Sequence, residues 1–212
     1  MKLYSFFNSS TSYRVRIALA LKGLPYDYQG INLREGQQYS PAHRTLSPIG
    51  GVPVLEVDGA VLTQSLAIID YLDSQYPAPG LIPVDARQRT RVLEIANLIG
   101  CDIHPVNNVR VLNYLQNVLA VSAEQKTAWY RHWVAEGLSA VEALLQRHGS
   151  GNYCVGDEAG LAECCLIPQV ANAERMGCDL SGYPRIMAVY HHCLQLPAFL
   201  AAAPARQTDF IA

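Results

Sequence analysis

Residues 9–19 of this chain read Ser9-Ser10-Thr11-Ser12-Tyr13-Arg14-Val15-Arg16-Ile17-Ala18-Leu19. The apolar residues 3–7 precede them, and the pattern predicts a short β-strand that leads directly into an α-helix. Hydroxyl side chains at a helix start cap its unpaired backbone N–H groups. The same position lies at the positive end of the helix dipole, where an anion is stabilised. The cluster is therefore either a plain helix cap or a site for an anion such as a thiolate.

The first third of the chain alternates between strand and helix patterns. After the helix, expected over residues 10–21 and ended by Gly23, residues 26–31 have the pattern of a second strand. Residues 32–47 are polar, and we expect a loop with at most one helical turn. Residues 52–62 predict a β-hairpin turning at Asp58-Gly59, and a helix is expected from about 63 to 76. This order predicts a small sheet with helices on its faces.

A linker follows at residues 76–83, which contain three prolines and a glycine. Beyond it, apolar residues recur with helical spacing and no hairpin signal returns, so we expect five or so helices in an all-α region. Residues 157–163 are expected to open one of these helices, with Glu163 bonding back to the Gly160 N–H. The sequence thus predicts two domains, an α/β domain at residues 1–80 and a helical domain at 85–212.

The composition is that of an ordinary globular protein. Of the 212 residues, 50% are hydrophobic and 16% are charged, and the formal net charge is −2. Because no tract is rich in lysine and arginine, the sequence does not indicate binding to nucleic acid or to an anionic membrane. Neither a signal peptide nor an apolar run of about 20 residues is present. We therefore expect a cytoplasmic protein.

Cysteine and histidine give no sign of a metal site. The six cysteines, at 101, 154, 164, 165, 178 and 193, form no C-x-x-C motif, and the six histidines lack ligand spacing. We expect reduced, mostly buried thiols and no metal.

Two shorter motifs each allow two interpretations. Pro53 follows Val52 at the start of a predicted strand. In one interpretation it is simply a proline on an edge strand. In the other, the Val52–Pro53 bond is cis and turns the N–H and C=O of Val52 outward, where they can pair with an extended peptide. Gln64-Ser65 at the start of the third predicted helix is either a simple cap or a site that holds a carboxylate.

Taken together, these features resemble the glutathione-binding domain of the glutathione transferases, and the all-α remainder matches that family's second domain. The motif S-S-x-S-x-R-V-R-I-A-L resembles the hallmark of the zeta class, the maleylacetoacetate and maleylpyruvate isomerases, as does the segment from Gly156 to Arg175. The chain departs from the class pattern twice. Thr11 stands where the class usually has cysteine, and Gly160 replaces the serine that caps the later helix.

The resemblance implies a glutathione transferase fold, with a thioredoxin-like α/β domain followed by an all-α domain, in a homodimer. It implies a glutathione-dependent cis–trans isomerase that converts maleylpyruvate to fumarylpyruvate in gentisate-type aromatic catabolism, by thiolate addition, bond rotation and elimination. The substrate would be a small dicarboxylate. Alternatives are a maleylacetoacetate isomerase, a detoxifying transferase or peroxidase with an apolar site, and a binding protein without catalysis.

The resemblance also assigns roles to individual residues. It places the glutathione sulfur near three hydroxyl side chains, those of Ser9, Ser10 and Thr11. Six residues would hold the rest of the cofactor: Val52 its backbone, Gln64 and Ser65 its γ-glutamyl end, Gln38 its glycyl end, and His104 and Asn108 from the helical domain. Arg175 and Arg110 are the candidates to bind substrate carboxylates, because a guanidinium matches both oxygens. Arg14 and Arg16 are expected to orient the first helix.

Overall fold

The computed structural model describes residues 1–148 and 151–211. The first part is built on a four-stranded mixed sheet in the order β2-β1-β3-β4. Its strands are β1 (Lys2–Ser5), β2 (Asp27–Gly30), β3 (Val54–Val57) and β4 (Ala60–Thr63). β1 runs parallel to β2 and antiparallel to β3, and β3 and β4 form the predicted hairpin around Asp58-Gly59. This is the thioredoxin-like arrangement that the resemblance implied.

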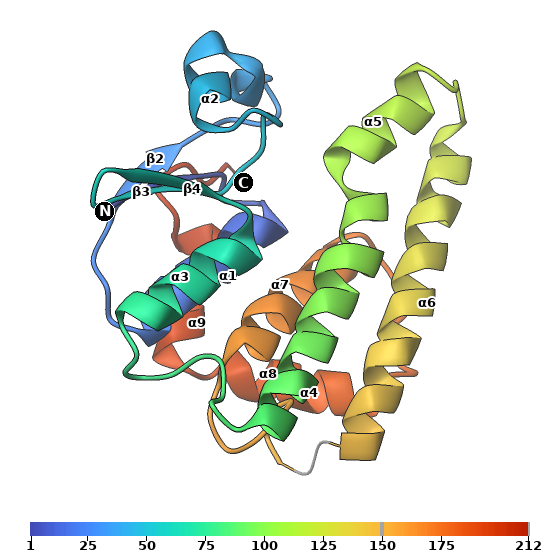
Figure 1. The fold of residues 1–212 in the computed structure, drawn as a ribbon. Coiled ribbons are helices and arrows are strands. Elements are labelled where there is room, and N and C mark those ends of the chain that lie inside the picture. Colours follow the sequence, from blue (N-terminus) through green and yellow to red (C-terminus); the bar gives the residue numbers. More distant parts are fainter. Residues whose placement is uncertain (149–150, 212) are drawn as a thin grey trace.

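Helices α1 (Ser10–Leu21) and α3 (Ser65–Gln75) pack together and cover one side of the sheet (Figure 1). The expectation of a loop at residues 32–47 was wrong in part. This segment contains a 3₁₀ turn, η1 (Gln37–Tyr39), and a six-residue helix, α2 (Pro41–Leu46). Ser40 caps α2 by accepting a hydrogen bond from the His43 N–H at 3.3 Å, and proline occupies its first position, where a missing N–H costs nothing.

The second part is helical, which confirms the predicted fold class. It contains α4 (Ala86–Asn97), a π-helical turn η2 (Leu98–Ile103), η3 (Pro105–Asn107), α5 (Val109–Asn117), α6 (Ala123–His148), α7 (Leu161–Arg175), α8 (Pro184–Cys193), α9 (Pro197–Ala202) and η4 (Pro204–Arg206). The α-helices described here number six rather than about five. The division at residues 80 and 85 stays a prediction, and residues 149, 150 and 212 of the helical range lie outside the described residues.

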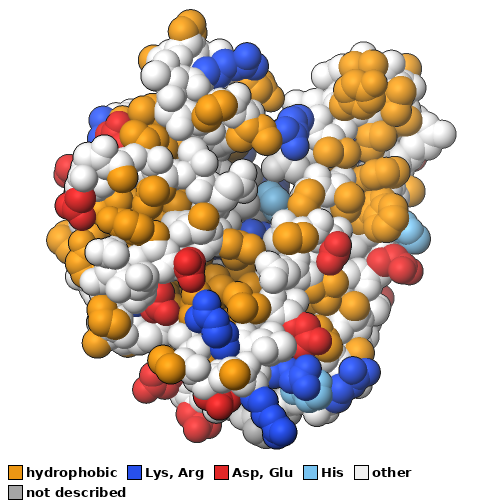
Figure 2. Space-filling model, viewed as in Figure 1, with side chains coloured by type: hydrophobic (Ala, Val, Ile, Leu, Met, Phe, Trp, Pro, Cys, Tyr) orange, Lys and Arg blue, Asp and Glu red, His pale blue; other side chains and the backbone are white. Residues whose placement is uncertain are grey.

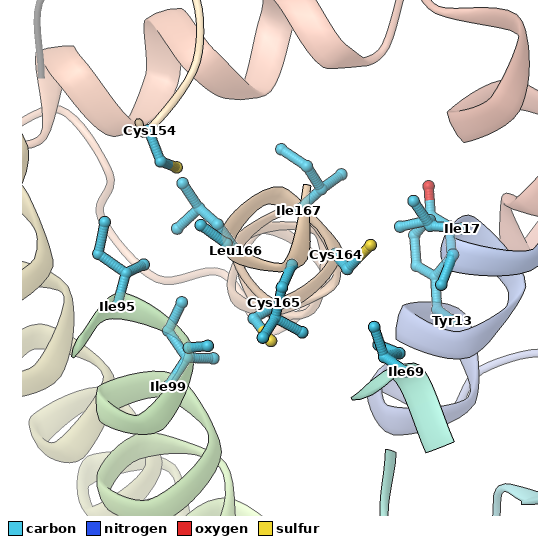
Figure 3. Close-up of a cluster of buried hydrophobic side chains, with 14 of the residues drawn as sticks. Tyr13, Ile17, Ile69, Ile95, Ile99, Cys154, Cys164, Cys165, Leu166 and Ile167 are labelled. Atoms are coloured by element: carbon cyan, nitrogen blue, oxygen red, sulfur yellow. The ribbon is translucent and has the colours of Figure 1, made fainter. Parts of the chain in front are cut away.

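Helix α7 is the centre of the core (Figure 3). Cys164 points toward α1 and Ile167 points away from α4, whereas Cys165 and Leu166 lie on the side of α4. All four side chains are fully buried, and α7 packs against both of these helices. α7 therefore joins the two halves of the molecule in one continuous core.

The thiols in this core are free. Four of the six cysteines are buried, Cys178 is half-buried and Cys101 is exposed, and none of the six is in a disulfide. Among the described residues, no group of three or more histidine, cysteine, aspartate or glutamate side chains is placed to hold a metal ion. Nor is any helix in these ranges long and apolar enough to span a bilayer.

The start of α7 explains the glycine found there. Glu163 Oε2 accepts a hydrogen bond from the Gly160 N–H at 2.7 Å, as the sequence predicted, and its Oε1 accepts one from the Cys154 N–H at 2.6 Å. A Cβ atom at position 160 would lie 2.5 Å from the Leu81 carbonyl oxygen. A serine would therefore force the linker away from α7, and only glycine permits this close approach.

A buried lysine fixes the linker. Lys22 Nζ, at the end of α1, donates to Asp73 Oδ1 at 2.8 Å and to the carbonyl oxygens of Tyr76 and Pro79 at 2.6 and 2.7 Å. Asp73 Oδ1 also accepts from the Leu81 N–H at 2.7 Å. Charge-assisted hydrogen bonds of this kind are strong when buried. They hold the linker against the ends of α1 and α3.

Candidate active site

A cleft of about 730 Å³ opens between the sheet domain and the helices. Figure 2 shows the molecule hollowed at this place, with basic and histidine side chains at the hollow. All eleven residues that the sequence pointed to line this one cleft: Ser9, Ser10, Thr11, Gln38, Val52, Gln64, Ser65, His104, Asn108, Arg110 and Arg175. The fold thus brings together residues from six separate segments of the chain.

The hydroxyl cluster at the start of α1 divides into distinct roles. Thr11 Oγ1 donates to the Val52 carbonyl oxygen at 2.9 Å, so its only proton is used. Ser9 Oγ lies 3.0 Å from Thr11 Oγ1 and must therefore be the donor of that pair. It also accepts from the Ser12 N–H at 3.2 Å, which makes Ser9 the helix cap. The helix-cap interpretation therefore holds for Ser9, whereas the Thr11 hydroxyl gives its proton to the Val52 segment.

Ser10 is the hydroxyl that remains. Its side chain lines the cleft with a residue exposure of 8%, and within the described chain it makes no hydrogen bond to protein. It is the first residue of α1, so the helix dipole and the unpaired N–H groups of the first turn lie beside it. Ser10 is therefore the donor best placed to bond to an anion in the cleft.

Val52 lies directly opposite this cluster. The Val52–Pro53 peptide is cis. In the described residues the Val52 N–H has no hydrogen-bond partner, whereas the Val52 carbonyl oxygen accepts from Thr11. Of the two backbone groups that a cis bond was expected to turn outward, the N–H is therefore the one that is free. His43 Nε2 lies 2.9 Å from the neighbouring Gly51 carbonyl oxygen and steadies this segment.

Ser65 begins α3, which has no side-chain cap on its first turn. Gln64 precedes it with a positive φ of 68° and lines the cleft beside it. Arg14, on α1, contacts Ser65: its Nη1 donates to Ser65 Oγ at 3.3 Å. Arg14 itself lines the cleft and is only 2% exposed. Arg14 therefore faces the cleft in addition to linking α1 to α3.

Arg16 does have the structural role that was expected. Its Nε donates to the Ala202 carbonyl oxygen at 2.9 Å, and its Nη2 donates to that of Phe7 at 2.9 Å. Nη1 bonds to Ser5 Oγ at 3.1 Å. This fully buried guanidinium holds the β1–α1 turn and α9 together, away from the cleft.

Gln38, in η1, is buried and lines the cleft. Its Nε2 donates weakly to the Leu33 carbonyl oxygen at 3.4 Å, and its Oε1 is buried without a hydrogen-bond partner. The side chain can therefore offer the cleft an acceptor, or a donor if the amide turns over.

His104 follows the π-helical turn η2, where the helix widens before Pro105 ends it. The helix is interrupted here, and the imidazole lines the cleft. Asn108 Oδ1 accepts from the Arg110 N–H at 3.0 Å, so its Nδ2 is the atom 3.2 Å from His104 Nε2. Since Nδ2 only donates, Nε2 is the acceptor and the imidazole proton is on Nδ1.

The charge state of His104 follows from its surroundings. Burial, and secondly the positive charge of Arg14, lower the pKa of His104 from 6.5 to about 3. His104 is therefore neutral at physiological pH and can act in the cleft as a hydrogen-bonding group.

Arg175 ends α7 and is held by its neighbour one turn earlier. Its Nη2 donates to Asn172 Oδ1, and Asn172 Nδ2 donates to the Tyr130 hydroxyl at 2.7 Å. Burial raises the pKa of Tyr130, so the phenol keeps its proton. Arg175, Asn172 and Tyr130 all line the cleft, as does Arg110 from α5.

The cleft is strongly cationic. Four arginines line it, Arg14, Arg34, Arg110 and Arg175, and its described lining contains no aspartate or glutamate. Arg34, Asn172 and Tyr130 are absent from the sequence-based set. Asn172 lies within the quoted class motif, three residues before Arg175, and that spacing was the available signal. Arg34 sits in a segment interpreted as loop, and nothing in its pattern marked it.

Comparisons with known proteins agree with this geometry. A family model described as the glutathione S-transferase N-terminal domain matches residues 1–74. A maleylpyruvate isomerase of a Ralstonia species is 46% identical over 99% of both chains. A solved holo structure of maleylpyruvate isomerase, described as a bacterial zeta-class glutathione S-transferase, is 46% identical over the full length of both chains with a TM-score of 0.97.

One further solved structure was obtained with ligands in its active site. The maleylacetoacetate isomerase of Anaeromyxobacter dehalogenans is 39% identical over 99% of this chain and 93% of its own, with a TM-score of 0.89. That protein holds dicarboxyethyl glutathione and citrate.

Proposed function

The chain belongs to the zeta class of the glutathione transferases, and from this premise we propose that it is a glutathione-dependent isomerase that converts maleylpyruvate to fumarylpyruvate. The observation that carries the proposal is the composition of the cleft. A hydroxyl donor at a helix N-terminus faces a set of arginines with no carboxylate among the described lining residues. Such a site favours a sulfur anion on one side and a substrate with several carboxylates on the other.

The residues present fit glutathione. The cleft volume suits a tripeptide together with a small acid. Val52 presents a free N–H to an extended backbone, and the uncapped first turn of α3 presents donors to a carboxylate. When bound, glutathione supplies a sulfur nucleophile that adds to the cis double bond and leaves again after the carbon–carbon bond has rotated.

On the glutathione side, the task of the chain is to favour a thiolate at neutral pH. The Ser10 hydroxyl and the dipole of α1 favour the charged form of a sulfur placed there, which lowers the pKa of the thiol. Ser9 and Thr11 act indirectly, since Ser9 caps the helix and Thr11 holds the Val52 segment against it.

On the substrate side, the arginines supply charge. Arg175, whose orientation is held by Asn172, and Arg110 on α5 are assigned to the substrate carboxylates and to the negative charge that develops on the substrate oxygen. Neutral His104 adds a hydrogen-bonding group without a second positive charge. The structure of the relative that holds dicarboxyethyl glutathione and citrate supports this assignment, because both ligands carry several carboxylates.

A comparison of substrates tests the proposal. Initial rates with glutathione would be measured for maleylpyruvate, for maleylacetoacetate and for an uncharged chlorodinitrobenzene. We expect kcat/KM for the two acids to exceed that for the uncharged electrophile by at least about 100-fold, since each arginine–carboxylate pair contributes about 1.5–3 kcal/mol. A preference for the uncharged electrophile would instead support the detoxifying transferase. The ratio between the two acids identifies the natural substrate, since pockets discriminate one methylene by about 10–200-fold.

The class membership also supports a homodimer in the cytoplasm, with residues 1–80 as the glutathione-binding domain and 85–212 as the substrate-binding domain. Sedimentation equilibrium is expected to give twice the mass of one chain, and a single-chain mass at assay concentration would contradict the dimer.

A further inference from the structure

Arg14 is a buried cation without a counter-ion. The residue is 2% exposed, and its Nε and Nη2 atoms are buried with no hydrogen-bond partner among residues 1–148 and 151–211. In the described chain no carboxylate forms an ion pair with it. Arg16, two residues later and equally buried, bonds through all three of its nitrogens. Burying an uncompensated charge is costly, so the position of Arg14 calls for an anion in the cleft that it lines.

The single bond that Arg14 makes determines how Ser65 behaves. A guanidinium is only a donor, so Ser65 Oγ is the acceptor in the 3.3 Å bond from Nη1. The Ser65 proton is therefore directed away from Arg14. Ser65 also begins an eleven-residue helix without a side-chain cap, whose first N–H groups face the same cleft. The guanidinium, the hydroxyl and the helix terminus thus all favour one anion.

We propose that Arg14 is a positioning residue of the glutathione site: acting through Ser65 and through its charge, it makes the first turn of α3 selective for the α-carboxylate of the γ-glutamyl residue. The inference rests on the proposed function, because it takes glutathione as the ligand. His104, whose pKa is lowered by burial and by the charge of Arg14, is neutral and adds no second positive charge beside Arg14.

The test compares two ligands on two proteins. Glutathione and γ-aminobutyryl-cysteinylglycine, which is glutathione without its α-carboxylate, would be titrated by calorimetry into the wild type and into Arg14→Met. We expect the wild type to prefer glutathione by about 100-fold and the variant by less than about 10-fold, as for a lost charge-assisted hydrogen bond. An equal preference in both proteins would overturn the proposal.

Three further variants keep the result interpretable. Arg89→Met removes an exposed arginine outside the cleft and is expected to keep the full preference. Arg14→Lys restores the charge and is expected to recover part of it, and it serves as the test if Arg14→Met does not fold. Arg14→Met is expected to cost less preference in the Ser65→Ala background than in the wild type, because part of the effect of Arg14 passes through Ser65.

The kinetic readout separates this role from a merely structural one. Arg14→Met is expected to raise KM for glutathione at least about tenfold while kcat at saturating glutathione stays within about threefold. If the wild type binds no glutathione, the proposed function fails as well. If the wild type binds glutathione and isomerises maleylpyruvate but Arg14→Met keeps its preference, the role of Arg14 alone fails.

Discussion

The carboxylate of Asp209 accepts a hydrogen bond from the Phe7 backbone N–H at 3.1 Å, which joins the last part of the described chain to the turn that carries the hydroxyl cluster. The other carboxylate oxygen accepts from the Tyr28 hydroxyl at 2.6 Å, and the Phe210 ring packs edge-on against that of Phe7. Phe7 lies two residues before Ser9. The segment after η4 therefore fixes the backbone from which α1 begins.

We expect Asp209→Ala to weaken both stability and activity. Loss of two partly buried hydrogen bonds to a charged acceptor should lower the free energy of unfolding by about 2–4 kcal/mol. The loosened turn should lower kcat/KM by about tenfold, since small displacements of reacting groups are costly. Urea unfolding and initial rates measure the two effects. Tyr28→Phe is the matched control, because it leaves the bond to Phe7, and it should keep its activity. An Asp209→Ala protein that is less stable but fully active would contradict this positioning role.

The three hydroxyls of the cluster should behave differently. Ser10→Ala is expected to raise the pKa of the bound glutathione thiol by about one unit or more, because it removes the free donor. Ser9→Ala should mainly cost about 1 kcal/mol of stability, as loss of a helix cap does. The ultraviolet absorbance of the thiolate, followed against pH in the complex, gives the pKa directly. If the thiol pKa rose in Ser9→Ala and stayed unchanged in Ser10→Ala, Ser9 and not Ser10 would be the hydroxyl that bonds to the sulfur.

The arginine at the end of α7 should affect substrate and not cofactor. Arg175→Ala is expected to lower kcat/KM for maleylpyruvate by about 100-fold and to change glutathione affinity by less than about threefold. Arg175→Lys should recover little, because an ammonium cannot bind a carboxylate through two parallel bonds. Asn172→Ala, which frees the Arg175 side chain, should give an intermediate loss. An unchanged rate in Arg175→Ala would remove this residue from the mechanism.

Because His104 is buried in its neutral form, the free energy of unfolding should depend on pH in a specific way. The unfolded chain binds a proton at this residue with a pKa near 6.5, whereas in the folded protein burial and Arg14 lower the pKa to about 3. The free energy of unfolding therefore falls as the pH is lowered from about 6.5 toward 3, with a loss of about 2 kcal/mol by about pH 5. Urea unfolding of the wild type and His104→Gln at several pH values measures it. Parallel curves for the two proteins would show that His104 is not buried neutral.

Much of the cleft could be predicted because its residues carry local signals. Hydroxyls before a helix, Val-Pro before a strand and Gln-Ser before a helix each mark a backbone terminus with unpaired groups. What the residue types could not show was how the protons are shared among Ser9, Ser10 and Thr11. That depends on the Val52 carbonyl, which lies 41 residues away from Thr11 in the sequence.

The two motif arginines were interpreted as a pair, and the structure gives them different surroundings. Residues two apart on a helix point about 200° away from each other, so Arg14 and Arg16 could not both face the same neighbour. Arg16 donates hydrogen bonds to backbone carbonyl oxygens, whereas Arg14 lines the cleft. α2 was missed for another reason, because six residues in a polar segment give too little periodicity, although the Ser40-Pro41 pair is a helix-start signal. The bond from Phe7 to Asp209 depends on tertiary folding alone.

The most direct test of the account is a balance of product against thiol. Purified protein would be supplied with a large excess of maleylpyruvate over glutathione, and fumarylpyruvate and free thiol would be measured together over time. The account predicts that product exceeds the glutathione supplied by at least about 100-fold, with the thiol concentration unchanged and no conversion when glutathione is left out. Product that stops at one equivalent of glutathione, or thiol that is lost as product forms, would contradict it.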